Sequence, residues 1–338
     1  MRIFGSSRLA ITLGLLMPAA AAAQVIDLTI HDVGVAIGDK PQMTGLRINF
    51  RDRRLNEVNG VNVTFWQPYE PPTGVVNGLA LGLPTTGART VNGALVGLLG
   101  GGVEKSLTGI AVGGVGIGAG GDLRGIQIGG VGVGSGGRVT GLTVGGVGVG
   151  SAGTMRGIQI GGVGVGGGGD LSGISIGGVG VGAAGKVSGI AIGGVGVGGG
   201  GEFQGIGIGG VGIGGAGNMT GLMIGGVGVG SGGTLTGLSI GGVGVGAERL
   251  RGVAMSLVGA GAQYAHAIVL TGGYFKIEDR GRFDGGAIAA VTNVKGEQHG
   301  LTIGLFNYAH ELHGAQIGLI NVSDNDGNRR VLPLLSVR

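Results

Sequence analysis

A sixteen-residue repeat constrains this chain more than any other feature of its sequence. Nine glycines open successive units at a constant spacing of 16: Gly109, Gly125, Gly141, Gly157, Gly173, Gly189, Gly205, Gly221 and Gly237. Looser units, spaced 14 to 18 residues apart, extend the series back to Gly45 and forward to Gly314. Each unit is too small to bury its apolar side alone, so a series of this kind indicates one continuous solenoid of stacked units.

Each unit carries aliphatic side chains at fixed positions and varied side chains between them. In the unit that opens at Gly125 the aliphatic residues are Ile126, Ile128, Val131 and Val133, with Val139 completing the set. Period-two alternation of β-branched residues is typical of strands. We therefore expect these aliphatic residues to point inward. The variable positions should face solvent, and they include Gln127, Thr143, Ser175, Ala191 and Met223.

Glycine recurs at fixed positions within each unit. The parity of the aliphatic residues switches at Gly129 and Gly130, so we expect a corner or a bulge there. Gly132 and Gly134 should leave one outer face flat and nearly bare. The chain has 91 glycines among 338 residues, yet none recurs at every third position, which excludes collagen.

These patterns predict an all-β fold, a parallel β-solenoid of about 16-residue coils. The alternative is an up-and-down transmembrane β-barrel with one strand per unit. Three features favour the solenoid. The double glycine interrupts the alternation, Phe203 is the only aromatic residue in the nine regular units, and no period of 32 residues is present.

The chain divides into four regions. Residues 1–23 are expected to be a signal peptide, because Arg2 and Arg8 precede an apolar run and small residues follow it. We interpret 24–108 as an N-terminal cap with irregular repeats and 109–251 as the regular repeats. Residues 252–338 are interpreted as irregular repeats with a C-terminal cap. The chain has no cysteine, so packing and hydrogen bonds must hold the fold.

Motifs that carry chemistry are weak here. GxGxxG matches are unavoidable with so many glycines, and no βαβ pattern accompanies them. His310, Glu311 and His313 lack the zinc spacing, and the segment from Asp324 to Asn328 lacks the closing glutamate of a calcium loop. We therefore predict no catalytic, cofactor-binding or metal-binding residues and no enzyme activity. One candidate contact patch combines basic and aromatic residues: Arg47, Arg51, Arg53, Arg54, Trp66 and Tyr69.

Two segments near the C-terminus share one pattern. Gly300–Asn307 is GLTIGLFN and Gly314–Asn321 is GAQIGLIN. This doubled GxxIGLxN pattern resembles the repeats of uncharacterised exported bacterial glycine-rich surface-repeat proteins. The resemblance covers about 22 residues of the chain, and it implies export and a cell-surface or outer-membrane setting. It brings no activity, ligand or site residue with it.

The sequence thus predicts an exported, non-enzymatic structural or adhesive surface protein, located at the cell surface, outer membrane or periplasm. The outer-membrane barrel is the alternative function. Candidate partners are cell-envelope components or a second copy of the chain through the glycine face. A formal net charge of +4, with no clustered basic face, argues against nucleic acid.

Overall fold

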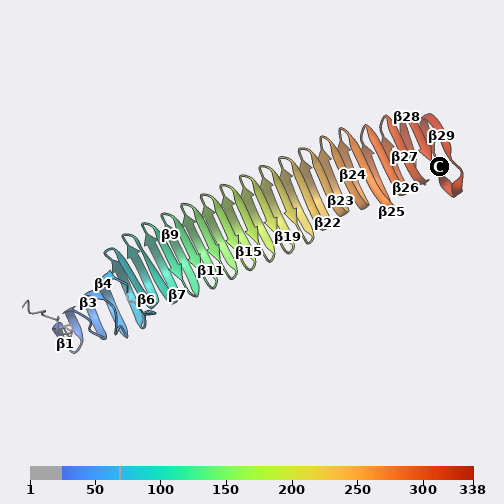
Figure 1. Cartoon of the computed structure of the whole chain (residues 1–338). Helices are drawn as coiled ribbons and strands as arrows, with labels where there is room; N and C mark the ends of the chain where they lie inside the picture. The colour runs from blue at the N-terminus through green and yellow to red at the C-terminus, as the bar shows by residue number, and fades with distance from the viewer. Residues whose placement is uncertain (1–24, 68–69) are drawn as a thin grey trace, which may run out of the picture.

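The computed structural model describes residues 25–67 and 70–338. The predicted signal peptide and Tyr69 lie outside these ranges. The described residues form a straight rod of stacked strands that runs from β1 at one end to β29 at the other (Figure 1). The chain makes about 18 turns of about 16 residues each, so the predicted parallel β-solenoid is confirmed. The alternative barrel is wrong, because neighbouring coils run parallel and in register, as β10 does with β12.

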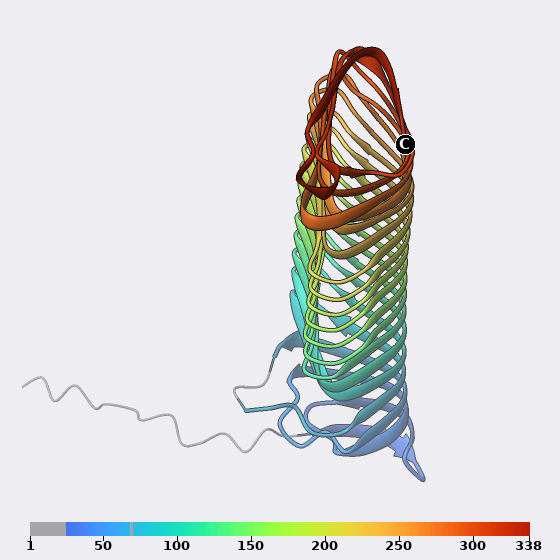
Figure 2. The same ribbon diagram turned by 90° about the vertical axis from the view of Figure 1, so that its right-hand side faces the viewer.

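Each regular coil contains one long strand and one short strand. In the coil that starts at Asp122, the long strand β9 (Asp122–Gly129) is followed by a corner at Gly130 and Val131 and by the short strand β10 (Gly132–Ser135). Residues pair with the residues sixteen positions further on, for example Leu123 with Val139. Viewed after a turn of 90°, the coils are flattened loops, with the long strands on one side and the short strands on the other (Figure 2).

The strands before and within the regular region are β1 (Ile26–Ile30), β2 (Val33–Ile37), β3 (Gln42–Arg51), β4 (Glu57–Trp66), β5 (Val75–Gly82), β6 (Thr85–Gly97), β7 (Gly100–Gly113), β8 (Gly116–Ala119), β11 (Val139–Gly145), β12 (Gly148–Ser151), β13 (Met155–Gly161), β14 (Gly164–Gly167), β15 (Leu171–Gly177), β16 (Gly180–Ala183), β17 (Val187–Gly193), β18 (Gly196–Gly199), β19 (Phe203–Gly209), β20 (Gly212–Gly215), β21 (Met219–Gly225) and β22 (Gly228–Gly241). The last part comprises β23 (Gly244–Ser256), β24 (Gly259–Thr271), β25 (Tyr274–Ile288), β26 (Val291–Ile303), β27 (Phe306–Leu312), β28 (Ala315–Ser323), a short 3-10 helix (Asn325–Gly327) and β29 (Arg330–Val337).

Three columns of side chains fill the interior of the regular coils. They are represented by Leu123, Gln127 and Val133, whose exposed fractions are 0%, 0% and 3%. The expectation that Val133 and Val139 point inward is therefore confirmed. The expectation that the Gln127 column faces solvent is wrong, because its members Thr143, Ser175 and Met223 are also buried.

The other aliphatic residues face outward, contrary to expectation. Ile126, Ile128 and Val131 are 39%, 40% and 49% exposed. The residues at 123, 127, 129 and 133 all point inward, so the alternation continues past the corner without changing parity. The three interior columns of Leu123, Gln127 and Val133 fill the space inside the flattened coil. The second set of aliphatic side chains therefore remains on the surface.

Two glycine positions in each coil are dictated by the backbone. Gly125 has a φ of +111°, a conformation that side-chain-bearing residues rarely adopt. At the corner, a Cβ on Gly130 would lie 1.9 Å from the carbonyl oxygen of Gly114 in the previous coil. Coils can therefore stack closely at these points only if glycine is present.

Both ends of the rod differ from its middle. At the N-terminal end β1 pairs antiparallel with β2, and at the C-terminal end β29 pairs antiparallel with β28. Two segments lie in the regions expected to be caps. The strand β3 belongs to an inner coil and pairs with β2 and β4. The segment after Asp324 forms the 3-10 helix that precedes β29. In the described part of the chain no helix has the length and apolar character needed to cross a bilayer.

Candidate functional site

The predicted contact patch is divided between the interior and the surface. Arg53 and Arg54 are exposed and Trp66 is 45% exposed. Arg51 lies beside Trp66, because the two residues are register partners on β3 and β4. Arg47 belongs to the buried Gln127 column and has no exposed surface, so it contributes nothing to a surface patch.

Arg47 instead fills the interior of the first coils through a closed polar network. Its Nη2 donates to Oδ1 of Asp39 at 2.7 Å, its Nε donates to the carbonyl oxygen of Lys40 at 2.9 Å, and its Nη1 contacts Asp52 and donates to Asn62. Asn62 and Thr64 donate to the other carboxylate oxygen of Asp52 at 2.8 and 2.7 Å. Buried charges are tolerated when they are paired and hydrogen-bonded in this way. The network therefore closes the N-terminal end of the apolar core.

The C-terminal end of the core is polar as well. In the column that holds Val133 in the regular coils, Thr292, Asn307 and Asn321 follow one another. Asn307 donates to Asn321 at 2.8 Å and to the carbonyl oxygen of Ile317 at 3.0 Å, and Thr292 donates to Asn307 at 2.7 Å. The asparagines of the two GxxIGLxN segments are thus interior residues that fix the corner backbone.

The weak motifs take structural positions. His310 and Glu311 lie on β27, and the ring of His313 stacks on that of His299 with centroids 4.8 Å apart. The side chain of Asn325, in the 3-10 helix, accepts a hydrogen bond from the amide of Leu312 and donates one to its carbonyl oxygen, both at 3.0 Å. Among residues 25–67 and 70–338 no group of three or more potential metal ligands is found.

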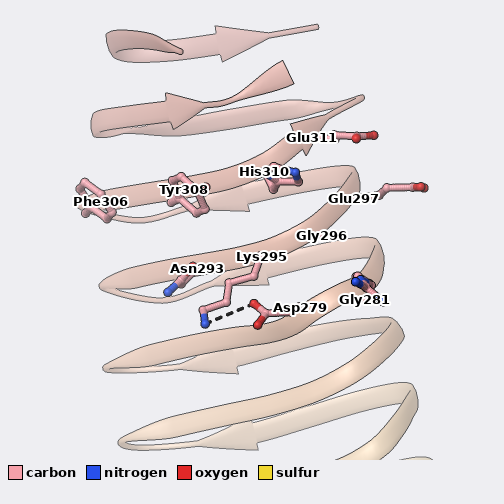
Figure 3. A pocket seen from close by; sticks show the side chains of 11 residues that line it. Asp279, Gly281, Asn293, Lys295, Gly296, Glu297, Phe306, Tyr308, His310 and Glu311 are labelled. Carbon is pink, nitrogen blue, oxygen red and sulfur yellow. Dashed lines mark ion pairs between the residues drawn. The ribbon is translucent and has the colours of Figure 1, made fainter. Parts of the chain in front are cut away.

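A groove that the sequence did not predict lies on the short-strand side near the C-terminal end. It has a volume of about 830 Å³. Phe306, Tyr308 and His310 project in a row from β27, Asn293 and Lys295 project from β26, and Lys295 pairs with Asp279 at 3.3 Å (Figure 3). The sequence feature that marks this groove is the point at which the outward glycines of the short strands give way to larger residues. Gly259 and Gly261 of one coil are followed in register by Tyr274 and Lys276.

Ion pairs lie both in this groove and beside it. Lys276, the register partner of Asn293, lies beside the groove and pairs with Glu278 at 2.7 Å, which raises the pKa of the Lys276 ammonium group. Burial, with a smaller effect from Asp324, raises the pKa of the Tyr308 hydroxyl, so this group is a neutral hydrogen-bond donor at ordinary pH. The groove therefore offers aromatic edges and paired charges, an arrangement suited to holding a polar ligand or a surface chain.

The regular coils present a second and much larger surface on their long-strand side. Two columns of half-buried or exposed aliphatic residues run along it, and we call them the aliphatic columns. Their members are Ile110, Ile126, Leu142, Ile158, Ile174, Ile190, Ile206, Leu222 and Leu238, and Val112, Ile128, Val144, Ile160, Ile176, Ile192, Ile208, Ile224 and Ile240. The corner valines continue this apolar surface around one edge of the rod, and each is 48% to 50% exposed: Val115, Val131, Val147, Val163, Val179, Val195, Val211, Val227 and Val243.

The short-strand side of the same coils has almost no side chains. Its outward positions form two glycine columns. The members are Gly116, Gly132, Gly148, Gly164, Gly180, Gly196, Gly212, Gly228 and Gly244, and Gly118, Gly134, Gly150, Gly166, Gly182, Gly198, Gly214, Gly230 and Gly246. The predicted flat and nearly bare face is therefore present.

Charged residues of the regular coils gather at the opposite edge. Asp122, Arg124 and Arg138 lie at the start of their coils, and residues 125–137 contain no charge. Asp122 accepts a hydrogen bond from the amide of Arg138 at 2.9 Å, and this bond, with a smaller effect from Arg124, lowers the pKa of the Asp122 carboxyl. The rod therefore has one polar edge and one apolar edge.

Comparison with protein-family models, curated proteins and solved structures finds no match to this chain. The solenoid of about 16-residue coils is shown by the structure itself. The membership suggested by the GxxIGLxN segments remains a prediction.

Proposed function

We propose that this chain is an exported, non-enzymatic structural rod of the cell envelope that acts through contacts of its apolar face. The observation that carries the proposal is the repetition of the aliphatic columns in nine successive coils. A catalytic site gathers unlike residues at one place, whereas here the same neutral surface is presented over and over. An exposed apolar surface of this extent marks an interaction site on a protein.

Export is supported by the signal-like residues 1–23. The proposed location is the periplasm, the outer membrane or the cell surface. A rod built from packing and hydrogen bonds alone does not depend on the redox state of its compartment.

Cell fractionation tests this function. The tagged chain is expressed with residues 1–23 and without them, and the envelope and cytoplasmic fractions are compared with and without detergent. We expect the chain that retains residues 1–23 to be recovered from the envelope or the medium, and the shortened chain from the cytoplasm. Recovery of both forms from the cytoplasm would contradict export.

The structural role is tested separately with isolated envelopes. The purified chain should bind them, and the variant Ile126→Thr/Ile158→Thr/Ile190→Thr should bind more weakly, because these substitutions keep β-branched residues on the strand while removing apolar surface. Equal binding by both proteins would assign the attachment to another part of the molecule.

A further inference from the structure

The aliphatic columns are large enough to form a stable protein interface. Five of the eighteen side chains are 37% to 49% exposed and the other thirteen are half-buried, so several hundred Å² of apolar surface, an order-of-magnitude figure, is left uncovered along nine coils. The largest patch on a typical monomer is about 300–600 Å², whereas a stable interface buries about 800 Å² on each partner. The long-strand side therefore presents a continuous apolar surface long enough to line one side of a specific complex.

The glycine columns provide a surface of matching shape. A Cβ on Gly134 would meet no atom within 4 Å, and the same holds at Gly118, Gly150, Gly166, Gly182, Gly198, Gly214 and Gly230. These residues have ordinary φ angles, so neither packing within the coil nor the backbone explains the glycine. Each one costs about 0.5–1 kcal/mol relative to alanine in a strand. Their recurrence is explained if a partner approaches the backbone closely along this face.

The spacings of the two faces agree. Members of one column are separated by the distance between neighbouring strands, about 4.8 Å, on both faces. The two aliphatic columns are two residues apart along the strand, as are the two glycine columns, which gives about 6.8 Å in each case. Aliphatic side chains of one rod can therefore occupy the space above the glycines of another rod over the full length of the regular coils.

A lipid surface fits these residues less well than a protein does. Proteins that lie on a bilayer place basic residues beside the apolar face and aromatic residues at the interface. Residues 125–137 contain neither a charge nor an aromatic ring, and the corresponding segments of the next coils repeat this composition.

We propose that the partner of the aliphatic columns is a second copy of this chain, whose glycine columns receive them. The two faces lie on opposite sides of the flattened coil, so each rod uses one face for each neighbour. A contact between different faces does not close on itself, and the rods assemble side by side into an open array. This inference rests on the proposed structural function and names the partner in it.

Sedimentation of the purified full chain over a range of concentrations tests the proposal. The average mass should rise past that of a dimer as the concentration increases. The variant Gly134→Leu/Gly166→Leu/Gly198→Leu should fold, because its new side chains enter open space, and should need at least a tenfold higher concentration to assemble. The variant Ile126→Thr/Ile158→Thr/Ile190→Thr should show the same loss. The control Thr140→Leu/Ser172→Leu/Gln204→Leu adds three leucines outside both pairs of columns and should assemble like the natural chain.

Mixing the two defective variants tests which faces meet. Each retains the face that the other has lost, so together they should form a one-to-one dimer that does not grow further. If the mixture forms nothing, the pairing of the two faces is wrong.

A chain that remains monomeric at every concentration would overturn the proposal without affecting export or attachment. If this monomer floats with neutral phospholipid vesicles, the apolar face binds lipid instead. If the leucine variant does not fold, Gly134→Ala/Gly166→Ala/Gly198→Ala serves in its place, and unchanged assembly of a folded glycine variant also refutes the inference.

Discussion

The ring of Phe203 occupies the space that a side chain at Gly207 would need, since a Cβ on Gly207 would lie 3.1 Å from Cζ of Phe203. The two residues belong to different interior columns of the same coil. All coils share one cross-section, so a large residue in one column is accommodated by a small residue in the next. Ile213 and Met223 close the remaining space around Gly207 at the same distance of 3.1 Å.

Substitutions at these two residues should be coupled. We expect Phe203→Ala to lower the free energy of unfolding by about 3–5 kcal/mol through the cavity it leaves, and Gly207→Ala to lower it by about 1–3 kcal/mol through overpacking. The double variant Phe203→Ala/Gly207→Ala should lose less than the sum of the two. Denaturant unfolding followed by circular dichroism measures this, and strict additivity would show that the two side-chain positions do not share one space.

Removal of the buried guanidinium should destabilise the N-terminal end of the rod. Arg47→Met leaves the carboxylates of Asp39 and Asp52 buried without their partner, which costs about 3–5 kcal/mol. The matched control is Arg53→Met on the exposed surface, which should change the stability by less than about 0.5 kcal/mol. Protection of the amides of β3 and β4 from hydrogen exchange reports the loss locally. Equal protection in both variants would be inconsistent with a structural role for the network.

The Asp122 carboxyl should make the stability of its coil depend on pH. Its pKa is lowered below the usual 3.8 in the folded chain. Such a group stabilises the fold at pH values above its unfolded pKa, and the contribution is lost as the pH falls through the folded pKa. Asp122→Asn keeps an acceptor for the Arg138 amide, as Asn218 does for Thr234 at 2.8 Å. The natural chain should therefore be more stable than Asp122→Asn at neutral pH, and the difference should vanish in acid. Parallel pH curves for the two proteins would disprove this role.

Two exposed glycines of one coil should respond in opposite ways to alanine. At Gly130 the new Cβ would lie 1.9 Å from a backbone oxygen, whereas at Gly134 it would meet nothing within 4 Å. We expect Gly130→Ala to destabilise the rod, because the backbone of two coils must move apart. Gly134→Ala should stabilise the isolated rod by about 0.5–1 kcal/mol. Thermal unfolding at low protein concentration compares them, and a similar loss in both would mean that the space at Gly134 is not open.

The period of the repeat was sufficient to predict the fold. A constant spacing of sixteen residues between the opening glycines and the lack of a longer period indicate parallel stacking, and the register of Leu123 with Val139 shows it. The period alone could not show which side chains point into the coil and which point to solvent. Constant positions predict the interior, yet the interior column of Gln127 varies, because a large residue in one column is accommodated by a small residue in the next, as Phe203 is by Gly207. The residues in the columns of Ile126 and Ile128 stay aliphatic, although these two side chains are 39% and 40% exposed in the described part of the chain.

The candidate surfaces were only partly accessible from the sequence. The bare glycine face follows from Gly132 and Gly134 directly. The interior position of Arg47 depends on the coil parity and on Asp39 and Asp52, which approach from separate turns. The groove beside Tyr308 arises from the register of three strands, and a local motif does not contain this information.

Each regular coil pairs with the coil before it and the coil after it and repeats after sixteen residues, so the length of the regular part of the rod is set by the number of its repeats. Duplication or deletion of one whole repeat moves the two ends by one strand spacing, about 4.8 Å, and leaves both side faces and both polar end networks as they were. The distance between the two ends of such a rod can therefore be changed only in equal steps, each set by one whole repeat.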